Sequence, residues 1–258
     1  MGARSLPDIM VAPNGARRTT ADHPELPVTI PQIVDTAKAC YAAGAGGIHA
    51  HVRDADQRHV LDAGLYSELT GELARQVPGM AVQITTEAVG RYTPDEQRAV
   101  VRAVMPEMVS VSLREMLPDD DDTADAARFY AWAHEAEIAV QHILYAPDEI
   151  ARLAALVSVG VVPREDMQLL FVLGRYAVNQ ESDPADLQPF LSELARSGLE
   201  ADWAVCAFGR GETAALAAAF EAGGKVRVGF ENSLWNADGS VAADNAERVS
   251  AIAAVAEH

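Results

Sequence analysis

The sequence predicts an α/β protein with a (β/α)8 barrel, formed as a single domain by residues 1–258. Eight short apolar segments alternate with eight segments of helical pattern. The apolar segments are continuous rather than alternating, which is typical of parallel strands buried on both faces. The chain of 258 residues also matches the length of about 250 residues that such barrels usually have.

The first four strand–helix units occupy the N-terminal half of the chain. Strands are predicted over 8–12, 47–54, 80–86 and 108–113, and helices over 30–43, 65–77, 93–105 and 123–136. Thr29 is a suitable N-cap with Pro31 in the first turn, and Gly44 ends that helix. Thr93 and Glu96 have the spacing of a capping box.

The last four units follow in the same order. Strands are predicted over 138–144, 167–173, 202–208 and 225–230, and helices over 147–159, 183–196, 212–222 and 244–256. Pro147 and Pro184 open two of these helices, and Gly198 ends one. An open doubly wound sheet is the main alternative, but it usually has fewer units, and no G-x-G-x-x-G follows the first strand.

Composition and charge exclude several classes of protein. A net charge of −18 repels nucleic acid and anionic lipid, so no nucleic-acid partner is expected. No apolar run reaches the ~18 residues of a membrane helix, and the N-terminus lacks the apolar core of a signal peptide. The two cysteines, Cys40 and Cys206, are expected to be reduced and buried. We therefore expect a cytoplasmic protein without a membrane partner.

Polar side chains occur where the predicted strands end, which is where barrel enzymes hold their active residues. The candidates from the first four strands are Asn14, Arg17, His49, His51, Thr85, Glu87 and Glu115. Those from the last two strands are Arg210, Arg227, Glu231 and Asn232. A general preference for polar strand ends does not explain the charged residues that interrupt apolar runs.

The segment around His49 and His51 predicts a metal site. Alternate residues of a strand share a face, so the two imidazoles point the same way. Glu231 is the best third ligand, because it ends the last strand and faces the histidine strand across the barrel mouth. Three alternatives stay open: a histidine pair that binds no metal, a Glu231 carboxylate that simply pairs with Arg227, and Asp54 as the third ligand, although Asp54 lies on the opposite strand face from the histidines.

Several stretches together resemble the β-keto acid cleavage enzymes, a family of zinc-dependent (β/α)8 proteins long catalogued only as a domain of unknown function. The resemblance covers essentially the whole chain. It rests on residues 13–17, 23–29, 43–54, 83–86, 171–174, 203–205, 209–210, 226–231 and 245–247.

The resemblance implies an activity and a set of roles. The family condenses a β-keto acid with acetyl-CoA, giving acetoacetate and the CoA ester of the remaining acyl group. It implies one zinc ion per chain, held by His49, His51 and Glu231, and a homo-oligomer, specifically a tetramer. Thr85 stands where the family holds substrate with a small hydroxyl residue. Arg227 matches the arginine that acts with an aspartate to deprotonate the substrate.

Two positions depart from the family pattern. The family aspartate after the zinc glutamate is Asn232 here, and an amide cannot serve as a general base. Either another acid such as Glu87 or Glu115 takes that role, or the reaction is altered or lost. Some members carry an acid at the position of Arg17 to meet a cationic substrate, so the arginine suggests an anionic or neutral tail, unless it is an exposed loop residue.

A phosphate site for CoA is predicted beside Arg210. Barrels often bind phosphate near strands seven and eight, and the Gly209–Gly211 turn precedes a helix whose amides can bind anions. An ordinary glycine turn is the alternative. Two other functions also remain open: a metal-dependent hydrolase or lyase that does not use CoA, and a catalytically silent zinc-containing ligand-binding barrel.

Overall fold

A closed parallel barrel forms the centre of the molecule, as the sequence predicted. The computed structural model describes residues 4–118 and 123–256, and its strands are paired in the order of the sequence, with the last strand closing on the first. The strands are β1 (Ile9–Val11), β2 (Gly47–Ala50), β3 (Ala81–Thr85), β4 (Met108–Ser112), β5 (Ala139–Leu144), β6 (Gln168–Leu173), β7 (Asp202–Ala207) and β8 (Lys225–Val228).

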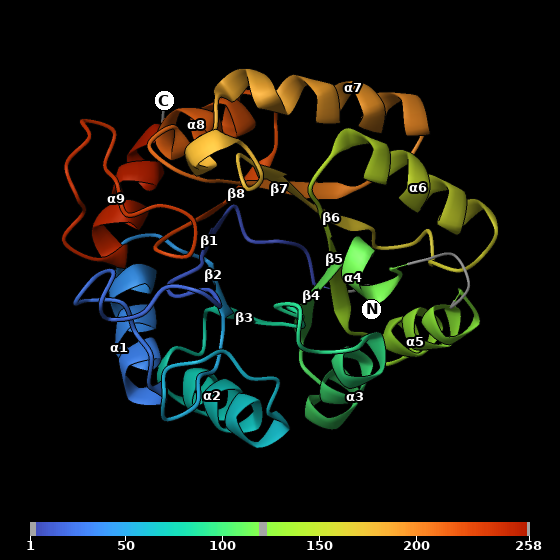
Figure 1. The fold of residues 1–258 in the computed structure, drawn as a ribbon, viewed down its shortest axis with the longest axis horizontal. Coiled ribbons are helices and arrows are strands. Elements are labelled where there is room, and N and C mark those ends of the chain that lie inside the picture. Colours follow the sequence, from blue (N-terminus) through green and yellow to red (C-terminus); the bar gives the residue numbers. More distant parts are fainter. Residues whose placement is uncertain (1–3, 119–122, 257–258) are drawn as a thin grey trace.

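The helices form a ring around these strands (Figure 1). They are α1 (Ile30–Ala42), α2 (Ala63–Gln76), α3 (Pro94–Val104), α4 (Leu113–Met116), α5 (Thr123–Glu135), α6 (Pro147–Ser158), α7 (Leu187–Ser197), α8 (Glu212–Glu221) and α9 (Asn245–Ala256). Two short 3₁₀ helices, η1 (Val178–Gln180) and η2 (Pro184–Asp186), lie between β6 and α7. The last helix packs against the first, which completes the ring.

Local capping chemistry explains where the helices begin. The Thr29 side chain accepts a hydrogen bond from the backbone N–H of Gln32, and Oε1 of Gln32 accepts one from the backbone N–H of Thr29, so the predicted N-cap is a full capping box. Thr93 and Glu96 form a second capping box at the start of α3, as predicted. Each box satisfies backbone donors that a helix N-terminus leaves without partners.

Three features differ from the sequence prediction. The strands predicted over 47–54 and 225–230 end at Ala50 and Val228, because the chain turns out of the barrel at both places. The short helix α4 follows β4 directly and was not predicted. The first turn of the helix predicted over 183–196 is the 3₁₀ helix η2.

Alternation along the strands separates two apolar layers. On β6, Leu169 and Phe171 pack outward against the helices, whereas Leu170 and Val172 point into the barrel. Burying one such side chain stabilises the fold by about 1.5–3 kcal/mol. The barrel interior also contains Cys206, and both cysteines are buried thiols, as predicted.

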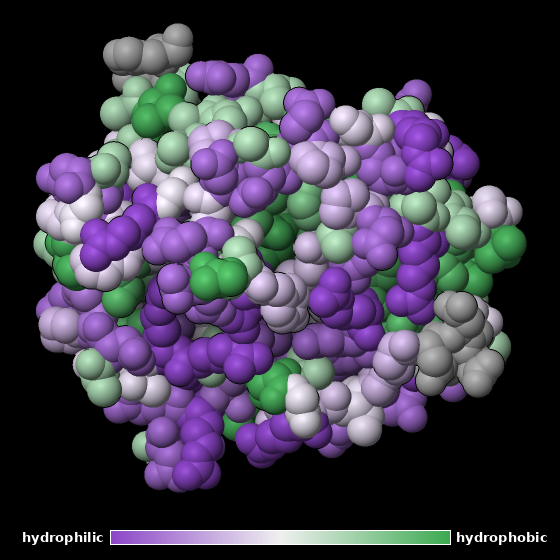
Figure 2. Space-filling model, turned by 45° about the horizontal axis from the view of Figure 1, so that its top comes forward, coloured by the Kyte–Doolittle hydropathy of each residue, from purple (hydrophilic) through white to green (hydrophobic). Residues whose placement is uncertain are grey.

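Among the described residues, the exposed large apolar side chains are Tyr41, Met105, Val159, Tyr176, Val178 and Val241. Figure 2 shows a face that is mainly hydrophilic, on which apolar residues lie scattered in small patches. Within residues 4–118 and 123–256, no helix combines the length and apolarity that crossing a bilayer requires.

Candidate metal centre and active site

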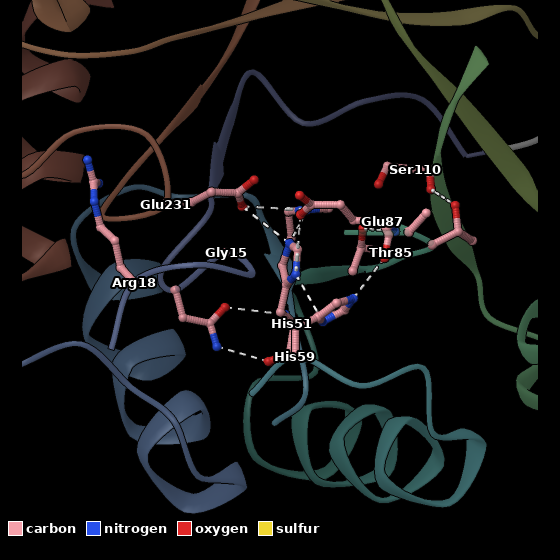
Figure 3. Close-up of polar contacts among 12 residues, drawn as sticks. Gly15, Arg18, His51, His59, Thr85, Glu87, Ser110 and Glu231 are labelled. Carbon is pink, nitrogen blue, oxygen red and sulfur yellow. Dashed lines mark hydrogen bonds and ion pairs between the residues drawn. The ribbon is translucent and has the colours of Figure 1, made fainter. Parts of the chain in front are cut away.

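The polar group at the mouth of the barrel consists of His49, His51 and Glu231. His49 lies on the inward face of β2 and His51 follows the end of that strand, so their rings meet edge to face. The Glu231 carboxylate reaches them from the segment after β8 (Figure 3). The structure thus brings together the three residues proposed as metal ligands.

The distances within this group require a cation or a proton between the side chains. The Nε2 atoms of His49 and His51 are 3.1 Å apart, and each lies 3.6 Å from Oε2 of Glu231. Two imidazole lone pairs at that distance repel each other unless a positive charge lies between them. Oε2 of Glu231 is itself buried without a hydrogen-bond partner.

The donor set fits a zinc ion. Zinc binds imidazole nitrogen and carboxylate oxygen at about 2.0–2.2 Å in a tetrahedral arrangement, which places ligand atoms about 3.3 Å apart. The observed separations of 3.1 and 3.6 Å bracket that value. Three protein ligands also leave a fourth position open, as in catalytic zinc sites.

A turn after β8 puts Glu231 in place. Gly229 adopts a φ of +137°, and the Glu231 N–H donates to the carbonyl of Ala12. A Cβ at position 229 would lie 2.6 Å from that same carbonyl oxygen, so only glycine fits. Glu231 therefore reaches the site through a turn rather than through the strand alternation that predicted its direction.

Arg227 contacts Glu231 on the side away from the histidines. Its Nη2 lies 3.3 Å from Oε1 of Glu231 and 3.6 Å from Sγ of Cys206. Glu231 therefore both pairs with Arg227 and faces the histidines, and the two alternatives considered from the sequence are compatible. Burial alone would raise the pKa of Glu231, but the charge of Arg227 is the largest opposing cause, and that pKa lies well below its usual range.

The imidazoles are held from behind by polar side chains. Nδ1 of His49 lies 2.8 Å from Oε1 of Gln83, whose amide nitrogen donates to Gln141. Nδ1 of His51 lies 3.4 Å from Nδ1 of His59, whose Nε2 lies 3.0 Å from the carbonyl oxygen of Glu87. Burial lowers the pKa of His49 well below its ordinary value and that of His59 to about 3, so both rings are neutral.

A cavity opens from this polar group toward solvent. Its walls come from the strands, mainly near their C-terminal ends, and from the loops that follow them, the expected position for the active site of a barrel. The lining residues are Asn14, Gly15, Ala16, Arg17, Arg18, His49, Thr85, Glu87, Ser112, Glu115, Ile143, Tyr145, Val172, Arg175, Gln180, Phe208, Arg227 and Glu231.

Five of the predicted site residues line this cavity in addition to His49, Glu231 and Arg227: Asn14, Arg17, Thr85, Glu87 and Glu115. Thr85 is buried and its hydroxyl accepts from the Glu87 N–H, while the Glu87 carboxylate lies 3.9 Å from Nδ1 of His51. Glu115, on α4, accepts hydrogen bonds from the Ala88 N–H and from Gln97. Burial raises the pKa of Glu115. Arg17 is exposed at the cavity mouth.

Two predicted asparagines are committed to the framework. The Asn14 amide donates to the carbonyls of Pro27 and His51 and accepts from the His51 N–H, so it holds the end of β2. Asn232 is fully buried, and its amide nitrogen and oxygen have no hydrogen-bond partners. Its side chain is not among those that line the cavity.

Arg210 lies beside the N-terminus of α8 and outside the cavity lining. Its guanidinium stacks over Trp235 at 3.7 Å from the ring centroid and donates to the Gly239 carbonyl. The backbone N–H of Arg210 donates to the carboxylate of Glu181. A carboxylate of the protein itself thus holds the amide at which a phosphate was expected.

Sequence reasoning missed His59 and the aromatic side of the cavity. His59 follows His51 by eight residues, and a hairpin brings it back because Asp54 accepts from the backbone of Arg58. Three histidines within eleven residues were a usable signal. Tyr145 and Phe208 also line the cavity, but nothing in their sequence context distinguishes them from core aromatics.

Known proteins share sequence similarity with most of this chain. The family model for the beta-keto acid cleavage enzyme matches residues 8–258. A 3-oxoadipate:acetyl-CoA acetyltransferase from Cupriavidus necator is 25% identical, over 96% of this chain and 88% of that protein. A 3-keto-5-aminohexanoate cleavage enzyme from Fusobacterium nucleatum is 27% identical, over 94% of this chain and 88% of the relative.

Solved structures share the fold. The apo structure of ObcA aligns with a TM-score of 0.67 and 17% identity, over 90% of this chain, and the chain spans only 61% of ObcA. A type I 3-dehydroquinate dehydratase from Clostridium difficile aligns with a TM-score of 0.62 and 12% identity, over 99% of this chain and 94% of that one.

Proposed function

Because the chain belongs to the β-keto acid cleavage enzyme family, we propose that it transfers an acyl group from a β-keto acid to CoA at the expense of acetyl-CoA. The acid R–CO–CH2–COO⁻ and acetyl-CoA would give acetoacetate and R–CO–CoA, so that atoms and charge balance. Two relatives whose names include acetyl-CoA support its use here. The convergence of His49, His51 and Glu231 at the cavity floor is the observation that carries the proposal.

We propose zinc as the metal held by these three residues. When bound, it would act as a Lewis acid that polarises the keto oxygen and stabilises the negative charge of an enolate. The protein contributes the imidazoles of His49 and His51 and the ionised carboxylate of Glu231, which suit a divalent cation. The Arg227 contact on Oε1 leaves Oε2 of Glu231 directed at the imidazoles.

Arg227 and Thr85 are proposed to bind the substrate. The Nε and Nη1 donors of Arg227 are buried without hydrogen-bond partners, a costly state that an anionic group of a ligand would relieve. A substrate carboxylate is the natural acceptor for a guanidinium. The Thr85 hydroxyl already accepts from Glu87, and its proton is free to orient toward a substrate oxygen in the cavity.

Glu115 is proposed as the general base, with Glu87 as the alternative. The buried amide of Asn232 cannot accept a proton, so the base must come from another element. Glu115 lines the cavity, and burial raises its pKa toward the pH at which an enzyme works. Both of its hydrogen bonds to the protein go to Oε2, which leaves Oε1 to face the substrate.

The substrate tail is proposed to be anionic. Arg17 lies at the cavity mouth, and Arg175 lines the same cavity with its guanidinium 5.2 Å from the centroid of Phe208. Two arginines near an entrance favour a negatively charged ligand within an otherwise acidic protein. The relative named for 3-oxoadipate, a dicarboxylate, supports the same choice.

The proposed oligomeric state and cellular location follow from the family resemblance. We propose a homo-oligomer, specifically a tetramer, in the cytoplasm, with buried Cys40 and Cys206 thiols as support for a reducing compartment. Arg210 stays a candidate for binding a CoA phosphate. That role would require the Glu181 carboxylate to leave the Arg210 N–H.

The test is an assay for acetoacetate with zinc-loaded protein, acetyl-CoA and a panel of short β-keto acids with anionic, neutral and cationic tails. We expect wild type to turn over and to prefer the anionic tails. Glu231→Ala should abolish turnover, because it removes a metal ligand and the partner of Arg227. If wild type is inactive and Asn232→Asp is active, the proposal is contradicted, because the asparagine at position 232 would then be the reason that the natural chain does not catalyse this reaction.

A second candidate function rests on the buried Asn232 amide. A barrel that keeps the metal group but has no competent base would bind a β-keto acid without converting it. Calorimetric binding of the acid without acetoacetate release, in wild type and in Asn232→Asp, would favour this ligand-binding role. Turnover that does not depend on acetyl-CoA would instead favour a hydrolase or lyase.

A further inference from the structure

His59 is a buried side chain behind His51 whose role neither the family match nor the proposed reaction assigns. It lies after the hairpin that follows β2 and is 3% exposed. Its Nδ1 faces Nδ1 of His51 at 3.4 Å, and its Nε2 lies 3.0 Å from the Glu87 carbonyl oxygen. Figure 3 shows the ring of His59 between the His51 ring and the segment that carries Thr85 and Glu87.

The hydrogen-bond roles along this path have one consistent assignment. A carbonyl oxygen only accepts, so Nε2 of His59 carries a proton and donates to Glu87. Nδ1 of the neutral His59 ring is then an acceptor, and Nδ1 of His51 must donate to it. The lone pair of His51 is therefore left on Nε2, the atom that faces Glu231.

The other histidine obeys the same rule through different residues. The carbonyl oxygen of Leu169 accepts from Gln141, whose amide oxygen accepts from Gln83. Oε1 of Gln83 is then the acceptor for Nδ1 of His49, which leaves the lone pair on Nε2. Two independent hydrogen-bond chains thus end with free lone pairs on the two Nε2 atoms that lie 3.1 Å apart.

We infer that His59 is a positioning residue of the metal centre: its Nδ1 accepts a hydrogen bond from the Nδ1–H of His51 and so presents Nε2 of His51 to the metal. The inference rests on the proposed metal centre and adds a residue to it. The Glu87 carboxylate is the other acceptor near His51 Nδ1, but it lies at 3.9 Å, beyond hydrogen-bond distance. His59 also joins His51 to the backbone of Glu87, so it connects the metal centre to the substrate-binding end of β3.

Asparagine and glutamine replacements separate the two halves of the His59 ring. In His59→Asn the amide oxygen can occupy the place of Nδ1 and accept from His51, but the contact with Glu87 is lost. In His59→Gln the terminal amide occupies the place of Nε2 and donates to Glu87, but no acceptor faces His51. His59→Leu removes both functions, and His142→Leu is the matched control, because His142 is equally buried and lies outside the cavity lining.

The measurement is zinc affinity by competition with a chelator, together with long-range ¹H–¹⁵N NMR of the zinc-free protein to identify the His51 tautomer. Loss of such an outer hydrogen bond typically weakens metal binding by ~10–100-fold. We expect that loss in His59→Leu and His59→Gln, near wild-type affinity in His59→Asn, and no change in His142→Leu. The Nδ1–H tautomer of His51 should dominate in wild type and His59→Asn only.

Two kinds of result would overturn the inference. The first is a zinc affinity of His59→Gln that equals that of wild type. The second is an equal loss of zinc affinity in His59→Asn and His59→Gln. Either result would show that zinc binding does not depend on a hydrogen-bond acceptor at the position of His59 Nδ1. The Asn and Gln variants keep this comparison meaningful if His59→Leu fails to fold. A wild-type protein that binds no zinc would refute the metal centre itself, whereas unchanged variants beside a zinc-binding wild type would refute only the role of His59.

Discussion

At the scale of single residues, the site is a set of charges that compensate one another inside the barrel mouth. Glu231 is ionised because the guanidinium of Arg227 faces it, and His49 is neutral because burial and Arg227 disfavour its protonation. A buried charge without such a partner would be costly. The protonation state of each residue therefore depends on its neighbours, and removing one side chain changes the pKa values of the others.

Glu115→Gln tests the proposed base through its pH dependence. Burial raises the pKa of Glu115 above its ordinary 4.5, so the carboxylate is lost as pH falls through that raised value. We expect kcat of wild type to decline on the acidic side accordingly. The Gln variant should lose ~10²–10⁴-fold in kcat and also lose this acidic limb. If Glu87→Gln shows the larger loss while Glu115→Gln stays active, the base is Glu87.

Arg17→Glu tests the proposed recognition of an anionic tail. Reversing the charge at the cavity mouth should lower kcat/KM for an anionic β-keto acid at least tenfold, about 1.4 kcal/mol, relative to a cationic one. Arg58→Glu is the matched control, since it makes the same charge change on an exposed arginine outside the cavity lining. If both variants change kcat/KM equally, the effect comes from the overall charge of the protein and not from a contact between Arg17 and the substrate.

At the scale of elements, the turn after β8 decides where the third ligand lies. Gly229 has its N–H 3.4 Å from Oε1 of Glu212, and the next N–H, of Phe230, donates to Asn245. The Glu231 N–H then donates to Ala12, at the end of β1. These hydrogen bonds connect the turn to α8, α9 and β1. The turn, and not strand β8, therefore fixes the position of Glu231.

Gly229→Ala tests this turn against Gly223→Ala. Both glycines have a positive φ, but a Cβ at 229 would meet Ala12 O at 2.6 Å, whereas a Cβ at 223 would have nothing within 4 Å. Gly223→Ala should cost about 1–2 kcal/mol of unfolding free energy, the usual penalty for a left-handed backbone. Gly229→Ala should cost more and also weaken zinc binding, as measured by urea denaturation and chelator competition. Unchanged zinc affinity in Gly229→Ala would contradict the role given to the turn.

At the scale of the whole molecule, a buried ion pair joins the last two helices where the barrel closes. Arg248 of α9 lies 2.7 Å from Glu212 of α8, and both side chains are inaccessible to solvent. Burial raises the pKa of Glu212 to about 7 even beside Arg248. The pair supports the segment that carries Glu231, because Glu212 also faces the Gly229 N–H.

Arg248→Met should destabilise the fold by about 3–5 kcal/mol, since it leaves a buried carboxylate without its partner. The loss should be smaller at pH 5 than at pH 8. The folded-state pKa of Glu212 is raised, so stability from its protonated form is present at low pH and is lost as pH rises through that pKa. Thermal or urea unfolding of the variant at both pH values measures this. The double variant with Glu212→Leu should recover much of the loss, and a pH-independent loss would refute the explanation.

The sequence by itself determined the barrel and most of its elements. Apolar segments in strict alternation with capped helices leave few other ways to bury a chain of this length, and Thr29 and Thr93 cap the helices as predicted. It also identified the residues that meet at the mouth, because parallel strands end on one side of the barrel. Capping residues and apolar segments are local features of the sequence, so they can be recognised without knowledge of the rest of the fold.

Only the tertiary structure decided how those residues face one another. Strand periodicity could not reveal that Glu231 arrives through the Gly229 turn, that Asn232 is buried away from the cavity, or that Glu181 contacts the amide of Arg210. His59 became significant only when a hairpin placed it behind His51. Hydrogen bonds depend on distances of a few tenths of an ångström between segments far apart in the chain, and residue order alone does not specify those distances.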